Sequence, residues 1–156
     1  MKRNPGKLLL MLCLSMVGGG VVANAQDKDV SQIEADVPFA FAVGHIELPA
    51  GKYNIKRVSD ETPMLLEIQS ANGGPTVSFM TEDVQTRDDQ TANKSDLVFD
   101  KVGNQYFLSQ VWESGSASGR MLPESKMEKR LARETSLASG GSQVEKRSVV
   151  ASAKQA

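Results

Sequence analysis

The chain has 156 residues, a formal net charge of −1, and a single cysteine, a single histidine and a single tryptophan. This length is typical of one ordinary domain. One cysteine excludes an intrachain disulfide framework, one cysteine with one histidine excludes the common zinc sites, and the near-neutral charge gives no sign of a nucleic-acid partner.

The first 25 residues have the three parts of a secretory signal. Residues 1–7 carry three positive charges, residues 8–22 form an apolar run, and Ala23-Asn24-Ala25 is the small-x-small pattern that a signal peptidase accepts. The run is short for a membrane-spanning helix and contains three glycines. The sequence therefore predicts a signal peptide at 1–25, export to the periplasm or the outside of a bacterial cell, and no transmembrane segment after cleavage.

Removal of this segment reveals an uneven distribution of charge. Residues 26–156 keep 15 basic and 19 acidic residues and no cysteine. Residues 26–119 contain 15 acidic and seven basic residues, whereas residues 120–156 contain four acidic and eight basic residues. We expect an acidic body, held together by an apolar core, that is followed by a basic segment.

Residues 37–112 alternate large apolar residues with small or polar ones, the pattern typical of short β-strands. The expected strands are 37–43, 52–58, 64–69, 76–81, 96–102 and 105–112. Turn signals at 48–51, 71–75 and Gly103-Asn104 separate them, and the polar residues 82–95 are expected to form an exposed loop or a polar edge segment. Strict alternation in the last strand places Tyr106, Leu108 and Trp112 on one side, and Phe107 and Val111 on the other.

The pattern changes after residue 119. Ser125 and Glu128 have the spacing of a capping box, which predicts a basic helix from about residue 124 to 137. Residues 139–156 are rich in Ser, Gly, Ala, Lys and Gln, which favours disorder. The predicted organisation is a signal peptide at 1–25, a β-domain at 26–119, a basic helix at 120–138 and a disordered tail at 139–156. The predicted fold is all-β: a single antiparallel sandwich or small barrel of six to seven strands.

Three segments of the body resemble a family of small exported bacterial β-rich proteins of unknown function. The first runs from Pro38-Phe39-Ala40-Phe41-Ala42-Val43-Gly44 to Leu48-Pro49-Ala50-Gly51-Lys52-Tyr53, and the second is Leu65-Leu66-Glu67-Ile68-Gln69-Ser70. The third pairs Leu97-Val98-Phe99 with Tyr106-Phe107-Leu108 and Val111-Trp112. The resemblance covers roughly residues 37 to 131 and implies an exported β-fold, but no activity.

The residues that carry catalysis or bind metals form no recognisable pattern. His45 follows the first expected strand and has no nucleophile or acid in a local motif beside it, so we interpret it as a turn residue. Asp83, Asp88, Asp89 and Asp96 share one polar segment, but their spacing does not match a calcium loop. We therefore assign no catalytic residue, no metal site and no cofactor.

Two groups of residues are candidates for binding. Tyr53, Tyr106 and Trp112 would suit stacking on a sugar ring if they were exposed, and the simpler interpretation is that they are core or half-buried residues of the sheet. Lys126, Lys129, Arg130 and Arg133 dominate the predicted helix and would suit contact with anionic lipid, an acidic envelope polymer or a partner protein. The alternative is a solvated terminal helix that folds back onto the acidic body. The leading hypothesis is an exported, non-enzymatic interaction module. The alternatives are a carbohydrate-binding module that uses the aromatic residues, and a hydrolase that uses carboxylates.

Overall fold

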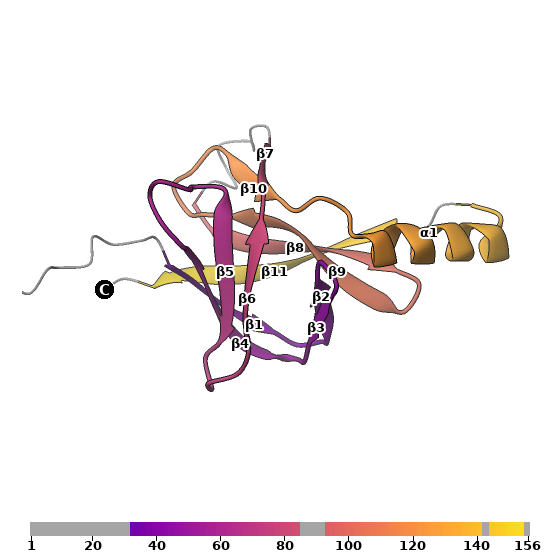
Figure 1. Ribbon diagram of the computed structural model, residues 1–156, viewed down its shortest axis with the longest axis horizontal. Helices are drawn as coiled ribbons and strands as arrows, with labels where there is room; N and C mark the ends of the chain where they lie inside the picture. The colour runs from indigo at the N-terminus through magenta and orange to yellow at the C-terminus, as the bar shows by residue number, and fades with distance from the viewer. Residues whose placement is uncertain (1–31, 85–92, 142–143, 155–156) are drawn as a thin grey trace, which may run out of the picture.

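The computed structural model describes residues 32–84, 93–141 and 144–154, so the predicted signal peptide lies outside the described residues. The all-β prediction is confirmed: within these ranges, eleven strands accompany one helix near the C-terminal end (Figure 1). The strands are β1 Gln32–Val37, β2 Phe41–Val43, β3 Ile46–Leu48, β4 Gly51–Arg57, β5 Leu65–Ser70, β6 Thr76–Met80, β7 Glu82–Val84, β8 Ser95–Val102, β9 Gln105–Trp112, β10 Gly119–Met121 and β11 Val144–Lys154, and the helix is α1 Lys126–Ser139.

The strands form one sheet that curls into a nearly closed barrel. Its main path is β3-β2-β9-β8-β11-β1-β4-β5-β6, and every pairing is antiparallel except β2 with β9. The chain passes from β6 through Thr81 into β7, which pairs with β10, and β10 pairs in turn with β9. The sheet therefore returns to β9 through β7 and β10, and the β2–β3 hairpin pairs with the other end of β9.

The prediction of six to seven strands was too low. Residues 32–36 of β1 precede the expected strand 37–43, and only residues 41–43 of that strand continue as β2, because Pro38 has no backbone N–H to donate to a strand ladder. Four further strands, β3, β7, β10 and β11, lie where no strand or only a polar edge segment was expected. Three of these four have three residues each, which is too short for an alternating pattern to be recognised.

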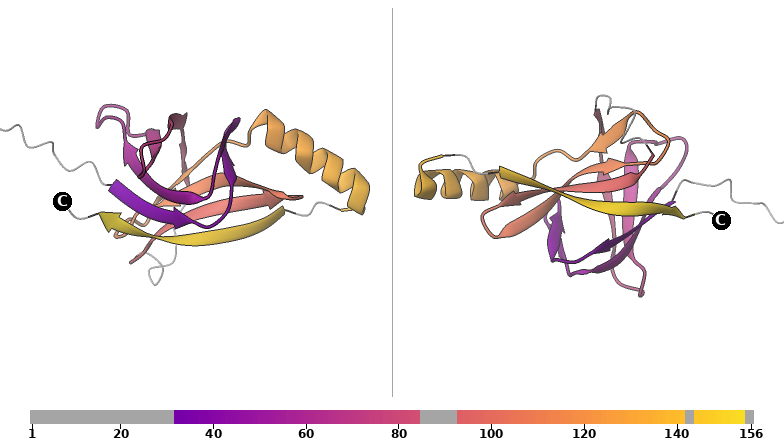
Figure 2. Two further views of the ribbon diagram at one scale, coloured as in Figure 1. Left: turned by 90° about the horizontal axis from the view of Figure 1, so that it is seen from below. Right: turned by 180° about the vertical axis from the view of Figure 1, so that it is seen from behind.

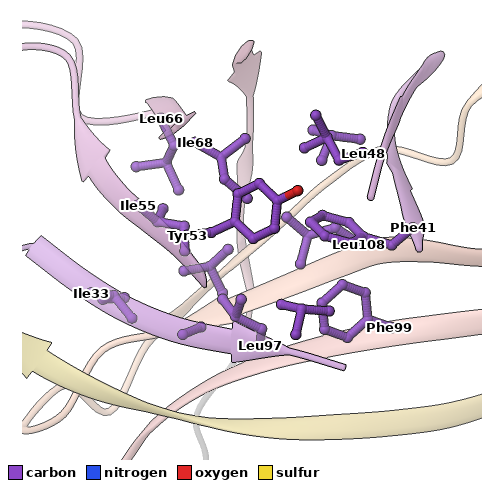
Figure 3. Packing of buried hydrophobic residues seen from close by; sticks show 14 of the residues in the cluster. Ile33, Phe41, Leu48, Tyr53, Ile55, Leu66, Ile68, Leu97, Phe99 and Leu108 are labelled. Atoms are coloured by element: carbon purple, nitrogen blue, oxygen red, sulfur yellow. The ribbon is translucent and has the colours of Figure 1, made fainter. Parts of the chain in front are cut away.

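Side chains from all sides fill the interior of the barrel (Figure 3). Alternate residues of β4 and β5 point into this interior: Tyr53, Ile55, Leu66 and Ile68 are all buried. The ring of Phe41 packs edge-on against Tyr53, with ring centroids 5.2 Å apart. The Tyr53 hydroxyl donates a hydrogen bond to the Pro49 carbonyl at 2.6 Å, which fixes the turn before β4.

An irregularity in β9 changes the side on which its last residues lie. Val98 faces Gln110 and Phe99 faces Leu108, so Ser109 is an extra residue, and its hydroxyl donates to the Val98 carbonyl at 3.1 Å. After this bulge Val111 joins Leu108 in the barrel core, whereas Trp112 is not part of that cluster. The prediction that Tyr106, Leu108 and Trp112 share one side was therefore wrong for Trp112.

The prediction of a disordered tail at 139–156 was wrong for residues 144–154, which form β11 between β8 and β1 (Figure 2). The composition is misleading because the strand needs few large apolar residues: both of its edges pair with neighbours, and inside the barrel the small side chain of Ala151 is buried. The charged residues of β11 are used in cross-strand pairs. Lys146 contacts Asp100 at 3.0 Å and Glu145 contacts Lys101 at 3.4 Å.

The predicted helix is confirmed as α1, with the expected capping box. The Ser125 Oγ accepts a hydrogen bond from the Glu128 backbone N–H at 3.0 Å, and the Glu128 carboxylate accepts from the Ser125 N–H at 3.3 Å. The helix ends at Gly140, which has the left-handed φ of 69° that favours glycine. One face of α1 packs on the outside of the barrel: Met127, Leu131 and Ala132 contact a small apolar cluster of Ala42, Val102 and Phe107.

Candidate functional site: the cationic face of helix α1

The four predicted cations lie together on the solvent face of α1. Lys126, Lys129, Arg130 and Arg133 are spaced by three and four residues, which places them on one side of a helix, and all four are exposed. Met127 and Leu131 lie on the opposite side against the barrel. The packing of the apolar face therefore fixes the direction in which the cations point. We call these four residues the cationic face.

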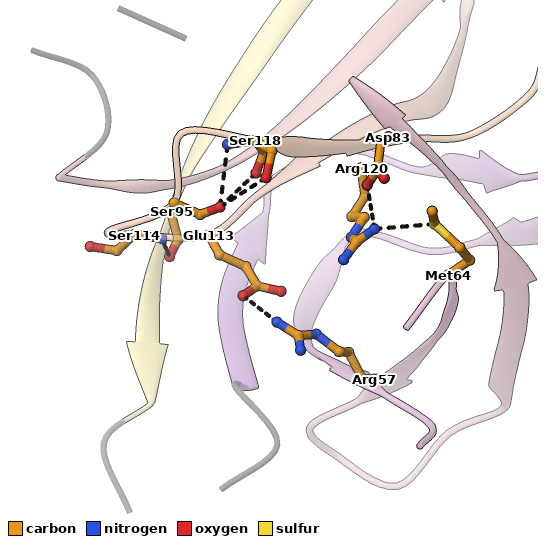
Figure 4. A network of polar contacts seen from close by, with 9 residues as sticks. Arg57, Met64, Asp83, Ser95, Glu113, Ser114, Ser118 and Arg120 are labelled. Atoms are coloured by element: carbon orange, nitrogen blue, oxygen red, sulfur yellow. Dashed lines mark hydrogen bonds and ion pairs between the residues drawn. The ribbon is translucent and has the colours of Figure 1, made fainter. Parts of the chain in front are cut away.

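The cations of the barrel are mostly engaged with acidic side chains. Arg57 pairs with Glu113 at 3.1 Å and Arg120 pairs with Asp83 (Figure 4). On the cationic face, Arg130 contacts Glu134 at 3.8 Å, and both of these side chains are exposed. Within residues 32–84, 93–141 and 144–154, the other three members of the cationic face form no ion pair. The positive charge of this face is thus available to a partner.

A leucine lies at the C-terminal end of the cationic face. Leu137 is 87% exposed, the largest exposure of any large apolar side chain in the described part of the chain. A shallow hollow of about 340 Å³ runs along the helix between Leu137 and the cations, and Glu134 also lines it. A partner on this face would meet positive charge along most of its length and one apolar contact at its end.

The buried face of α1 carries a titratable group beneath the cationic face. Glu128 is only 8% exposed, and burial raises its pKa from 4.5 to about 7. The hydrogen bond from Ser125 lowers this pKa, the charge of Asp100 and that of Glu124 raise it, and Lys146 lowers it. The Glu128 carboxyl, on the buried face of α1, therefore changes its protonation state near neutral pH.

The three candidate aromatic residues do not form one exposed platform. Tyr53 is 1% exposed in the barrel core, and Trp112 is 5% exposed on β9. The Trp112 ring lies tightly against β10, where a Cβ added at Gly119 would approach it to 2.7 Å. Stacking on a sugar requires an accessible ring face, which neither Tyr53 nor Trp112 offers.

Tyr106, the third aromatic candidate, belongs to a half-exposed cluster that the sequence did not predict. Its ring stacks on Phe39 with centroids 4.1 Å apart, and the Arg147 guanidinium lies 4.7 Å from the centroid of Phe39. Arg147 also donates a hydrogen bond to the Tyr106 hydroxyl at 3.1 Å. No local sequence pattern could predict that these residues are in contact, because they come from the β1–β2 connection, β9 and β11.

The residues considered for catalysis or metal binding are not brought together. His45 is exposed in the turn between β2 and β3. Asp83 pairs with Arg120 and Asp96 is buried on β8, whereas Asp88 and Asp89 lie outside the described residues. In the part of the chain that the structure describes, no three His, Cys, Asp or Glu side chains are grouped to hold a metal ion.

A pocket of about 400 Å³ lies between the β2–β3 hairpin, the β8–β9 turn and α1. Glu47 and Gln105 line its rim, where the Gln105 Nε2 donates to the Glu47 Oε1 at 2.7 Å, and Leu131 forms part of the wall towards the helix. The carboxylate pair that a hydrolase would need is not found in this pocket, since Glu47 is the one acidic residue among its described lining residues.

Comparison with known proteins gives no relative from which a function could be transferred. No family model, no curated protein and no solved structure matches the chain. None of the helices formed by the described residues has the length and apolar character needed to cross a membrane. The function is therefore inferred from the geometry and charge of the chain itself.

Proposed function

We propose that the protein is an exported, non-enzymatic interaction module that binds an acidic protein or an acidic envelope polymer through the cationic face of α1. The observation that carries this proposal is the arrangement of Lys126, Lys129, Arg130 and Arg133 on one exposed side of a helix whose other side is anchored to the barrel. The signal-like N-terminus supports export.

The packed barrel supports the role of a rigid scaffold. Large side chains occupy its interior, so the barrel holds the helix in place through the contacts of Phe107 and Val102 with Met127 and Leu131. A pre-ordered cationic surface loses less conformational entropy on binding than a flexible basic tail would. The acidic body also favours one orientation, because an acidic partner is repelled elsewhere and attracted at α1.

The proposal is tested by comparing two double charge reversals in a binding assay. The probe is a soluble polyglutamate, and binding is measured by fluorescence anisotropy at increasing salt concentration. We expect the wild type to bind with an affinity that falls as salt rises, and we expect K129E/R133E to lose most of this binding.

The control is K52E/K94E, which changes the net charge by the same amount at two exposed barrel positions. This variant is expected to bind at least several-fold more tightly than K129E/R133E. Equal losses in the two variants would show that only the total charge matters, and would overturn the assignment to α1. Absence of binding by the wild type at low salt would overturn it as well.

A further inference from the structure

Strand β6 has an edge without a partner in the otherwise nearly closed barrel. Among the described residues its only ladder partner is β5, with Leu65 opposite Met80 and Gln69 opposite Thr76. Strand β6 ends at Met80, and only the following strand β7 pairs with β10. Figure 1 shows β6 with β5 along one side of it. The backbone groups of the other edge are thus available for pairing with a further strand.

This edge differs from the two other strands that have a single partner. Strands β3 and β7 have three residues each and contain acidic side chains, Glu47 in β3 and Glu82 with Asp83 in β7. Short length and charge are the usual protections of a strand edge. Strand β6 has five residues, and no charged residue occurs from Ile68 to Thr81. Among β3, β6 and β7, strand β6 is therefore the longest and the one that contains no charged residue.

Side chains on both faces of β6 are incompletely covered. Met80 on the outer face is 61% exposed, and Thr76 and Ser78 are exposed beside it. On the inner face Val77 is buried, whereas Phe79 packs against the core but stays partly exposed. A strand added at this edge would cover both Met80 and Phe79.

We propose that β6 is a dimerisation edge, at which a second copy of this chain adds its own β6 in antiparallel orientation. Pairing centred on Ser78 places Ser78 opposite Ser78 of the second copy, Thr76 opposite Met80, and Val77 opposite Phe79. No like charges meet in this register, although residues 26–119 are strongly acidic and two such bodies repel each other elsewhere. An uncharged, self-complementary edge is therefore the surface at which two copies approach each other with the smallest electrostatic repulsion.

The register gives a direct test, because the residue at position 78 faces its own counterpart. The mass of the purified protein is measured by light scattering over a concentration series from low to high micromolar. The wild type is expected to pass from monomer to dimer, whereas S78K and S78E, each tested alone, are expected to remain monomeric. An equimolar mixture of S78K and S78E is expected to regain the dimer, because opposite charges then face each other.

The matched control is T62K, which adds the same charge at an exposed position in the β4–β5 connection. This variant is expected to dimerise like the wild type. A monomeric wild type at the highest concentration would overturn the proposal. Dimerisation of S78K as strong as that of the wild type, or failure of the mixed charges to restore it, would overturn the β6 pairing as well.

Discussion

Replacement of Glu128 by glutamine tests the energetics of the helix on which the proposed function depends. Glu128 is buried between α1 and the barrel and takes part in the capping box with Ser125. Glutamine is almost the same size and also accepts the Ser125 N–H bond, as the capping box permits. The substitution therefore removes the ionisation and leaves the packing nearly unchanged.

The expected magnitude follows from the pKa of Glu128, which burial raises from 4.5 to about 7. A pKa difference of one corresponds to about 1.4 kcal/mol, so the ionised carboxylate lowers the free energy of unfolding by up to about 3 kcal/mol. Below pH 4.5 the group is neutral in both the folded and the unfolded state, and this cost is absent. As the pH rises towards and beyond 7, the stability contributed by the neutral form is lost.

Urea unfolding measured from about pH 4 to about pH 9 provides the assay, with the fluorescence of Trp112 as the signal. E128Q is expected to match the wild type at the acidic end and to exceed it by about 2–3 kcal/mol at the basic end. E134Q, an exposed change on the same helix, is expected to follow the wild type throughout. A parallel pH dependence of E128Q and the wild type, or a less stable E128Q at high pH, would refute this reasoning.

Three further outcomes are expected. G119A should lose about 2 kcal/mol of stability because its Cβ would approach the Trp112 ring to 2.7 Å, whereas G141A, whose Cβ would meet nothing within 4 Å, should be neutral. Equal losses of stability for the two variants in urea unfolding would contradict this contact. S125A should cost about 1 kcal/mol through the lost cap, and unchanged thermal unfolding would argue against it. Truncation before β11 should abolish the β-sheet signal in circular dichroism; a truncated chain that folds would contradict the central position of this strand.

The local parts of the fold were predictable because they depend on neighbours in sequence. Gly103 and Asn104 predicted the β8–β9 hairpin, and the structure pairs Val102 with Gln105 across that turn. Ser125 and Glu128 predicted the start of the helix for the same reason. The alternation that predicted a strand at 52–58 is also seen in the burial of Tyr53 and Ile55, two residues apart.

The rest depends on partners that are distant in sequence. The sequence around Ser109 gives no signal of a bulge, yet the bulge places Val111 in the core in place of Trp112. The sequence of β11 alone resembles that of a polar tail. Its charged residues are explained only by partners that are distant in sequence, such as Asp100 on β8, which pairs with Lys146. The cationic face was predicted residue by residue, whereas the Tyr106 cluster was missed because Phe39 and Arg147 come from separate strands or connections.

The position of β11 has a consequence for the time course of folding. This strand lies between β1 and β8, and its pairing joins Gln32 to Lys154 across nearly the whole described chain. Contacts between residues so far apart in sequence form slowly. Before residues 144–154 have been synthesised, β1 and β8 each keep an unpaired edge that is able to pair with other chains. The barrel is therefore completed late, and a chain interrupted before this strand is an aggregation-prone species.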